Sequence, residues 1–151
     1  MTIELRDLTD ADEAAWRRLW RGYLEFYGAP EFDSRTPRLW TQLLDAEHSF
    51  QCRVAVHDEE AVGIVHFFDH LDTWFDGPVC YLNDLFVDPG SRGHGIGRLL
   101  IEDVNRIATE RGWQHVYWHT QSNNERARSV YDSFEGIGSD FMVYELPPAA
   151  G

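Results

Sequence analysis

The stretch Leu85-Phe86-Val87-Asp88-Pro89-Gly90-Ser91-Arg92-Gly93-His94-Gly95-Ile96-Gly97-Arg98-Leu99-Leu100 passes from an apolar run through a glycine-rich turn into an amphipathic pattern. It predicts a buried strand, a tight turn and the start of a helix. Glycines in the turn permit backbone conformations that other residues avoid, and the free N–H groups of a helix start carry partial positive charge. The stretch therefore predicts an anion site that suits a phosphate or a pyrophosphate.

The spacing of the turn separates this site from two other phosphate loops. A Walker-type loop ends in Gly-Lys-Ser or Gly-Lys-Thr, and the chain contains no lysine. A dinucleotide fingerprint requires Gly-x-Gly-x-x-Gly, whereas Gly93, Gly95 and Gly97 are two residues apart and Arg98 follows them. Neither nucleoside triphosphates nor dinucleotides are favoured as ligands.

Two motifs in order carry a family resemblance. The turn reads Arg92-x-x-Gly95-x-Gly97, and a later stretch, Asn124-Glu125-Arg126-Ala127-Arg128-Ser129-Val130-Tyr131, has the pattern Asn-x-x-Ala-x-x-x-Tyr. Together they resemble the GNAT superfamily of N-acetyltransferases over essentially the whole chain. The likeness is to small-molecule members from bacteria and, more distantly, to spermidine/spermine and thialysine acetyltransferases, with Tyr81 to Val87 as the shared strand.

The resemblance implies acetyl-CoA as co-substrate, bound without a metal. It implies that the main chain of one strand pairs with the pantetheine arm, that the glycine turn holds the pyrophosphate, and that a residue of the last helix contacts the arm. The implied residues are Leu85, Phe86 and Val87 for the strand, Arg92, Gly93, His94, Gly95, Ile96, Gly97 and Arg98 for the turn, and Asn124 for the arm. For Arg98, a solvated helix face is an equally good interpretation.

Acetyl transfer to an amine requires a group that accepts the amine proton and a donor for the departing thiolate. The resemblance implies Tyr131 as that donor, although Tyr131 also falls on an apolar helical stripe and would serve in packing. For the base, spermidine/spermine acetyltransferases have a glutamate where this chain has Asn83, whose amide accepts no proton at neutral pH. We expect Asn83 to orient substrate or a water molecule.

Asp84 is the alternative base, and the strand geometry limits it. Neighbouring residues of a strand point to opposite faces, so Asp84 replaces residue 83 only if the strand contains a bulge. Asp84 is therefore interpreted as a base, a structural cap or a group that acts through another residue.

The resemblance implies that the acceptor amine contacts the first two helices and the loop before the coenzyme strand. Aromatic residues on a helix are more often core than ligand contacts, so these candidates compete with a packing role. The candidate substrate residues are Tyr23, Glu25, Tyr27 and Asn83, with His66, Asp69 and Trp74 as further candidates.

Periodicity predicts an α/β (α+β) fold in one domain, residues 1–151, with a mixed central sheet of about six to seven strands and about four helices. Apolar residues recur at helical spacing in three stretches, and Ser122 with Glu125 forms a capping-box pattern for a fourth helix. The predicted helices begin at residues 10, 38, 96 and 122, and the predicted strands are 3–6, 51–57, 61–69, 79–87, 115–120 and 141–146.

Composition limits the partners. The formal net charge is −13 and all 13 basic residues are arginine, so nucleic acid and acidic membrane surfaces are poor partners. An acidic surface concentrates cationic amines, and it is equally typical of proteins from a high-salt environment. Without an apolar signal or spanning segment the expected location is the cytoplasm. Cys52 and Cys80 are expected to be buried free thiols, and the resemblance allows a homodimer through the first helix or the last strand.

These observations favour an acetyl-CoA-dependent N-acetyltransferase that acts on the primary amine of a small molecule, such as a polyamine or an amino acid. Two alternatives stay open. Asn83 in place of a glutamate suits a coenzyme-A-binding module with reduced turnover, and the acidic surface suits a protein-lysine or N-terminal acetyltransferase.

Overall fold

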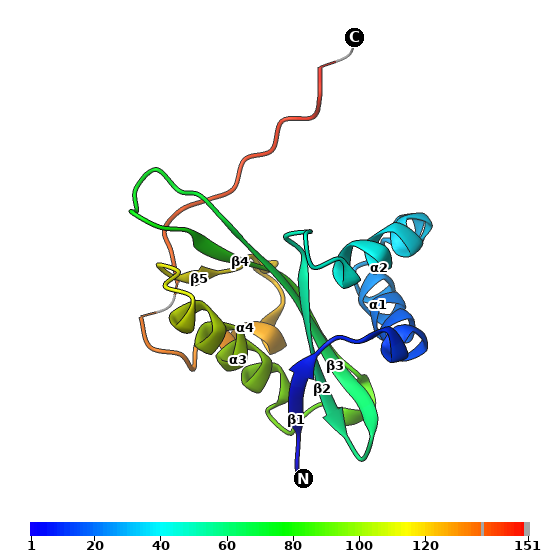
Figure 1. Ribbon diagram of the computed structural model, residues 1–151. Helices are drawn as coiled ribbons and strands as arrows, with labels where there is room; N and C mark the ends of the chain where they lie inside the picture. Colours follow the sequence, from blue (N-terminus) through cyan, green and yellow to red (C-terminus); the bar gives the residue numbers. More distant parts are fainter. Residues whose placement is uncertain (137, 150–151) are drawn as a thin grey trace. The chain divides into compact units, whose positions relative to one another are not determined.

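The computed structural model describes residues 1–136 and 138–149, and it divides the chain into two units, Met1–His119 and Thr120–Gly151. The first unit contains the whole sheet and three of the four described helices (Figure 1). Its elements are β1 (Glu4–Asp7), α1 (Glu13–Phe26), α2 (Thr36–Leu44), β2 (Gln51–His57), β3 (Glu60–His70), β4 (Val79–Val87), α3 (Ile96–Glu110) and β5 (Val116–Tyr117), with short 3-10 turns η1 (Asp10–Asp12), η2 (Pro30–Arg35) and η3 (Pro89–Ser91).

The sheet has the strand order β1-β2-β3-β4-β5. The first four strands pair antiparallel, and β4 pairs parallel with β5. Asp58 and Glu59, both with positive φ, form the tight turn between β2 and β3 that the charged sequence predicts. Parallel pairing needs a crossover, and α3 supplies it between β4 and β5.

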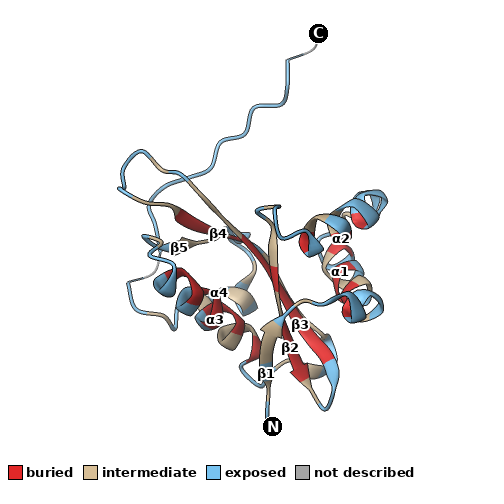
Figure 2. Ribbon diagram, in the orientation of Figure 1, coloured by how far each residue is buried: buried red, intermediate tan, exposed pale blue. Residues whose placement is uncertain are grey.

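Helices cover both faces of this sheet, α1 and α2 on one side and α3 on the other (Figure 1). Apolar residues of α1 and α2 form one core with the sheet, including Trp16, Leu19 and Trp40. The buried positions follow the sheet-facing sides of α1 and α3 and the middle of the strands (Figure 2). The amphipathic stripes of the sequence therefore predict which side of each helix is covered.

Helix α1 lies unusually close to β4. A Cβ added to Gly22 would stand 2.7 Å from the ring of Phe86, a distance that real Cβ atoms do not show. Only glycine allows this approach, and it brings the following turn of α1 over the middle of β4, where the candidate site lies.

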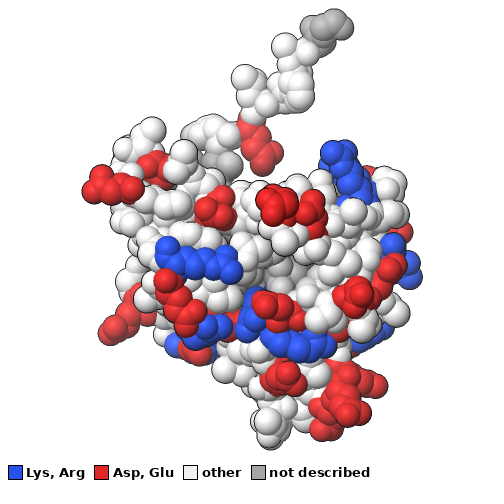
Figure 3. Space-filling model, in the orientation of Figure 1, with Lys and Arg blue, Asp and Glu red and all other residues white. Residues whose placement is uncertain are grey.

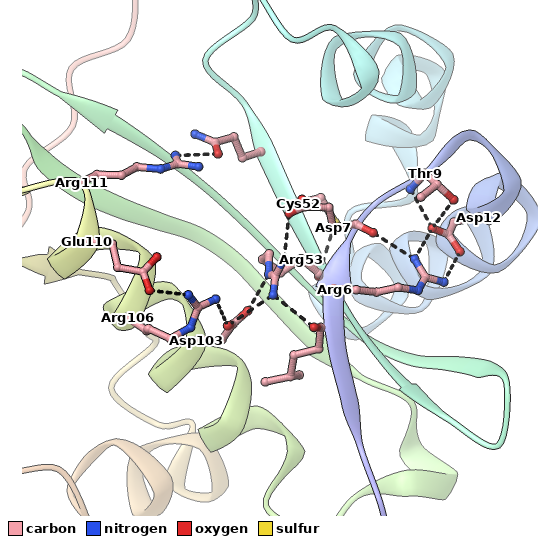
Figure 4. A network of polar contacts seen from close by, with 12 residues as sticks. Arg6, Asp7, Thr9, Asp12, Cys52, Arg53, Asp103, Arg106, Glu110 and Arg111 are labelled. Atoms are coloured by element: carbon pink, nitrogen blue, oxygen red, sulfur yellow. Dashed lines mark hydrogen bonds and ion pairs between the residues drawn. The ribbon is translucent and has the colours of Figure 1, made fainter.

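A polar network joins the sheet to α3 (Figure 4). Arg53 of β2 donates from Nε to Asp103 of α3 at 2.6 Å and from Nη1 to Asp7 of β1 at 2.8 Å. Arg106 donates to the same Asp103 at 2.8 Å. The Asp103 side chain is 4% exposed, so two arginines neutralise one buried carboxylate.

The sheet differs from the sequence prediction in its extent. Strand β2 has the predicted bounds, and β3 and β4 agree within a residue, but β5 covers only Val116–Tyr117 of the predicted 115–120. The predicted closing strand over 141–146 is not formed among the described residues, which gives five strands rather than six or seven. Alternation marks a strand only where a neighbouring strand supplies hydrogen bonds, and the side chains of Phe141 and Leu146 are 80% and 94% exposed.

The second unit contains α4 (Glu125–Tyr131). Its N-cap is Asn124, whose Oδ1 accepts from the backbone N–H of Ala127 at 3.3 Å. The predicted capping box from Ser122 is wrong, because Asn124 is the N-cap of α4 and the Glu125 backbone N–H donates to the carbonyl of Asn123 at 3.0 Å. The backbone carbonyl of Ser122 instead accepts from Arg128 at 2.8 Å.

Both cysteines are free and buried, as predicted. Burial raises the pKa of the Cys80 thiol to about 12 and raises the pKa of the Cys52 thiol further. Neither thiol is therefore a reactive thiolate.

Candidate active site

A pocket of about 790 Å³ opens between α1, η2, α2 and the middle of β4. Its volume lies within the range of small-molecule sites. The aromatic residues that line it are Trp20, Tyr23, Tyr27, Phe32 and Phe50. The polar residues that line it are Arg35, Arg38, Gln42, Asn83 and Asp84.

A β-bulge at Asn83 turns Asp84 into this pocket. His66 of β3 is opposite Asp84, whereas the next residue, Phe67, is opposite Leu82, so Asn83 has no partner in the register. Cross-strand partners share a face of the sheet. In a regular strand Leu82 and Asp84 would share a face, and the extra residue places them on opposite faces. The sequence allows Asp84 as a base only if the strand contains a bulge, and β4 contains one.

The Asp84 carboxylate is held by two donors. His66 Nδ1 lies 2.9 Å from Asp84 Oδ2, and Asn83 Nδ2 donates to Oδ1 at 3.3 Å. Tyr23 lines the pocket beside Asp84. The carboxylate is therefore fixed in position at the wall of the pocket.

The tautomer of His66 follows from its other contact. The indole Nε1–H of Trp16 donates to His66 Nε2 at 3.0 Å, and an indole nitrogen is only a donor. His66 Nε2 must therefore carry a lone pair, which places the ring proton on Nδ1, where it is donated to Asp84. His66 is 5% exposed, so this neutral imidazole supports Asp84 from within the core.

The tyrosines around Asp84 remain hydroxyl donors. Burial first, and the Asp84 charge second, raise the pKa of Tyr23 far above its ordinary value. The same two causes raise the pKa of Tyr27 and of Tyr81. These phenols keep their protons over the working pH range and take no part as bases.

The glycine turn has the geometry of an anion site. Gly93 and Gly95 have φ of 85° and 74°, values that favour glycine, and α3 begins at Ile96 directly after them. A Cβ at either glycine would meet no atom within 4 Å, so the space in front of the turn is open. Free N–H groups of the first turn of α3 and the guanidinium groups of Arg92 and Arg98 supply positive charge. Of these, Arg98 also pairs with Glu102 at 2.8 Å.

The approach to the turn is fixed by Asp88. Its carboxylate accepts from the Gly90 backbone N–H at 3.0 Å and from Arg18 of α1 at 2.6 Å. These contacts, the Gly90 bond foremost, lower the pKa of Asp88. The turn is thereby tied to the helix that carries Tyr23.

One edge of β4 is left without a strand near this turn. Pairing with β5 covers only Cys80 and Tyr81, so within Met1–His119 no strand pairs on that side with Leu85 to Val87. The Leu85 and Val87 side chains face α3, since each lies 3.9 Å from a Cβ built at Gly97, and Phe86 faces α1. The Val87 carbonyl accepts from Arg92 Nε at 3.1 Å, and no strand of this unit covers this edge from Leu85 to Val87.

Two sequence-predicted residues lie in the second unit. Asn124 caps α4 and Tyr131 is its last residue, seven positions on. The predicted coenzyme site also includes residues of the first unit, so the place of Asn124 and Tyr131 beside the coenzyme stays a prediction.

A family model described as "Acetyltransferase (GNAT) family" matches residues 13–135. The chain belongs to the GNAT acetyltransferase family. It is therefore an N-acetyltransferase by family, with the α+β fold that the sequence predicts.

The relatives include enzymes that act on small amines. D-amino-acid N-acetyltransferase HPA3 of Saccharomyces cerevisiae is 34% identical over 85% of this chain and 81% of its own. Aminoglycoside N(6')-acetyltransferase type 1 of Stenotrophomonas maltophilia is 27% identical over 95% of this chain and 92% of its own. Among solved structures, aminoglycoside N-acetyltransferase AAC(6')-Iy in complex with CoA superposes with a TM-score of 0.82 at 20% identity, over 98% of this chain and 96% of that one, which shows the shared fold.

The structure brings part of the predicted substrate set together. Tyr23, Tyr27 and Asn83 line the pocket with Asp84, whereas Glu25 is exposed and outside it, because it is two residues from Tyr23 on a helix and so points elsewhere. His66 lies behind Asp84 rather than in the pocket wall, and Asp69 and Trp74 do not line it.

Two arginines line the pocket without having been predicted from the sequence, Arg35 and Arg38. Arg35 and Arg38 flank Thr36-Pro37, a helix start whose proline signals the turn but not the direction of the two side chains. A signal was present in the pair of arginines one helical turn apart in a strongly acidic chain. Among the described residues, no helix is long and apolar enough to cross a bilayer, and no three metal-ligating side chains cluster.

Proposed function

We propose that this chain moves an acetyl group from acetyl-CoA directly to the primary amine of a small molecule, with Asp84 as the general base. The observation that carries the proposal is the bulge at Asn83, which turns a carboxylate fixed by His66 into an aromatic pocket. The names of the relatives, which act on D-amino acids and aminoglycosides, support a small amine as acceptor.

The glycine turn fits the coenzyme that the family uses. The open space before Gly93 and Gly95, the start of α3 and the two flanking arginines suit a pyrophosphate, and the unpaired edge of β4 at Leu85 to Val87 suits the pantetheine arm. His94, Ile96 and Gly97 complete the turn. Acetyl-CoA, when bound, supplies an activated acetyl thioester.

Asp84 prepares the acceptor. An alkyl amine with a pKa near roughly 10 is mostly protonated at neutral pH and has no free electron pair. Transfer of one proton from the ammonium group to the Asp84 carboxylate frees that pair, which forms the new C–N bond as the C–S bond breaks. The neutral His66 donates to Asp84 Oδ2 throughout, and Asn83, exposed at the bulge, orients the amine or a water molecule.

The proton that the leaving sulfur needs is assigned to Tyr131, on the family motif of α4. The phenol donates its proton to the thiolate, and the second proton, which the acetylated nitrogen loses, returns through solvent to the Tyr131 phenolate, while Asp84 releases its proton to solvent after the product leaves. Asn124 of the same motif is assigned to the pantetheine arm, beside its role as the cap of α4.

The test is free-thiol release from acetyl-CoA by the purified protein, with polyamines, amino acids, aminoglycosides and basic peptides as acceptors and mass spectrometry of the products. We expect release with a small amine, and a loss of about 10²- to 10⁴-fold in kcat for Asp84→Asn. Asp76→Asn, an exposed loop change outside the pocket, is the matched control and should leave kcat unchanged.

Three outcomes would contradict the proposal. Acetylation of basic peptides alone would point to a protein acetyltransferase. Coenzyme binding without release to any acceptor would point to a binding module, and equal kcat for Asp84→Asn and wild type would remove Asp84 as the base.

A further inference from the structure

The charges that line the pocket are of both signs. Arg35 and Arg38 stand at the start of α2, and Asp84 stands on β4. In a chain of net charge −13, the pocket thus holds two cations and one anion. Figure 3 shows basic side chains interspersed among the acidic ones, so the acidic total does not describe every local surface.

The two pocket arginines are not neutralised by carboxylates. Among the described residues, no ion pair involves Arg35 or Arg38, and the Arg35 guanidinium lies 5.0 Å from the centre of the Phe32 ring. A contact with an aromatic face holds a guanidinium in place without satisfying its charge. Between residues that the structure describes, ion pairs are formed by Arg6, Arg17, Arg18, Arg53, Arg98 and Arg106, among others.

The wall between these charges is aromatic. Trp20 stacks on Tyr23 with ring centres 5.0 Å apart, and Tyr23 contacts Tyr27 at 4.8 Å. Phe32 and Phe50 line the same pocket as these three rings. Such a wall binds an apolar or aromatic group of the ligand.

We propose, on the basis of the proposed function, that the acceptor is an amino acid with a large apolar side chain, whose carboxylate is bound by Arg35 and Arg38. Its amine lies at Asp84 and its side chain lies on the aromatic wall. Arginine forks match carboxylates in geometry as well as in charge. A polyamine or an aminoglycoside, which carries only positive charges, would place a cation against the two guanidinium groups, so the pocket disfavours both.

The test compares one amine with and without its carboxylate. Phenylalanine, as either enantiomer, and phenylalaninamide are assayed as acceptors by thiol release in wild type, Arg35→Gln and Arg38→Gln. The ratio of variant to wild type is taken for each acceptor separately, because this ratio cancels the different intrinsic reactivity of the two amines.

We expect each arginine variant to lower kcat/KM for phenylalanine by about 10- to 100-fold, mainly through KM, as the loss of a charge-assisted hydrogen bond predicts. For phenylalaninamide the change should be about threefold or less, since no carboxylate is present. Arg21→Gln, on an exposed position of α1 outside the pocket, should change neither acceptor.

Equal losses for the two acceptors, or better use of spermidine than of any amino acid, would overturn the inference while the proposed function stands. If no amine is acetylated, the proposed function fails and calorimetric binding decides the inference. Tighter binding of phenylalanine than of its amide, lost in Arg38→Gln, would support it, and equal binding would overturn it.

Discussion

Two polar regions of Met1–His119 differ in how their charged side chains are paired. Around Arg53, two guanidinium groups pair with carboxylates: Arg53 binds Asp7 and Asp103, and Arg106 binds Asp103 and Glu110 (Figure 4). In the pocket, the one carboxylate is bound by neutral donors, and the two guanidinium groups form no ion pair among the described residues.

The charged groups around Arg53 join elements of the fold, whereas those of the pocket are available to bind a ligand. A buried carboxylate that is paired with arginine cannot accept a proton from a substrate without the loss of that pair. Asp84 can, because its hydrogen-bond partners are a neutral imidazole and an amide, which remain donors to it. The network therefore serves the fold, and the pocket suits the proposed reaction on an amine.

The largest expected effect concerns the proposed proton donor, Tyr131 of α4 in the second unit. Tyr131→Phe should lower kcat by about 10²- to 10⁴-fold, because the leaving sulfur loses its acid, with little change in coenzyme affinity. Stopped-flow measurement of thiol release gives kcat, and titration with the coenzyme gives its affinity. An unchanged kcat would leave Tyr131 with a packing role only.

The network around Arg53 should contribute to the stability of the fold. Asp103→Asn should lower the free energy of unfolding by about 3 kcal/mol, since Arg53 and Arg106 then share no buried carboxylate. Urea unfolding gives this value, with Glu13→Ala as control. The Glu13 carboxylate, which pairs with Arg17, is 48% exposed, so its removal should change the free energy by less than about 1 kcal/mol. Equal losses in the two variants would mean that the network is not special.

How much of this follows from sequence depends on the kind of signal. The glycine turn, the β2–β3 turn and the faces of α1 and α3 follow from local patterns of glycine, charge and period. The bulge at Asn83 does not, because it depends on how β4 pairs with β3. The Arg35 and Arg38 wall depends on how α2 packs, and the alternation at 141–146 shows the reverse case, a local pattern without a described partner strand.

The anion site at the glycine turn adds a third kind of charge to the comparison, the partial positive charge of backbone N–H groups. Gly95→Ala should weaken coenzyme binding by about 10- to 50-fold, because the methyl group enters the open space where the pyrophosphate would lie and strains a φ of 74°. Gly112→Ala is matched to it, with the same φ of 74° and the same open space, at the other end of α3. Calorimetry should show weaker binding for the first variant alone, and equal weakening would assign the effect to strain.

The role of His66 is tested by a pair of variants. His66→Leu removes the donor to Asp84 and should lower kcat by about 10-fold, in line with one hydrogen bond to a charged group. His66→Asn keeps an N–H near the place of Nδ1 and should recover most of kcat. If both variants lose the same activity, His66 packs the core and does not position Asp84.

The smallest effect concerns pH. Arg6 donates to Asp12 at 2.8 Å and lowers the pKa of that carboxylate. A lowered folded-state pKa contributes stability above the pKa of the unfolded carboxylate, and this stability is lost as the pH falls through the folded value. Asp12→Asn should therefore cost about 1 kcal/mol at pH 7 and nothing at strongly acid pH. A loss that does not depend on pH would assign the effect to packing.

The most direct test makes the same kind of substitution, aspartate to asparagine, in each of the two regions. Asp84→Asn and Asp103→Asn are each measured for kcat with an amine acceptor and for the free energy of unfolding. We expect Asp84→Asn to lose at least about 100-fold in kcat with less than about 1 kcal/mol in stability, and Asp103→Asn to show the reverse. Full turnover in Asp84→Asn, or a loss of stability there as large as in Asp103→Asn, would contradict the division between the charges of the pocket and those of the network.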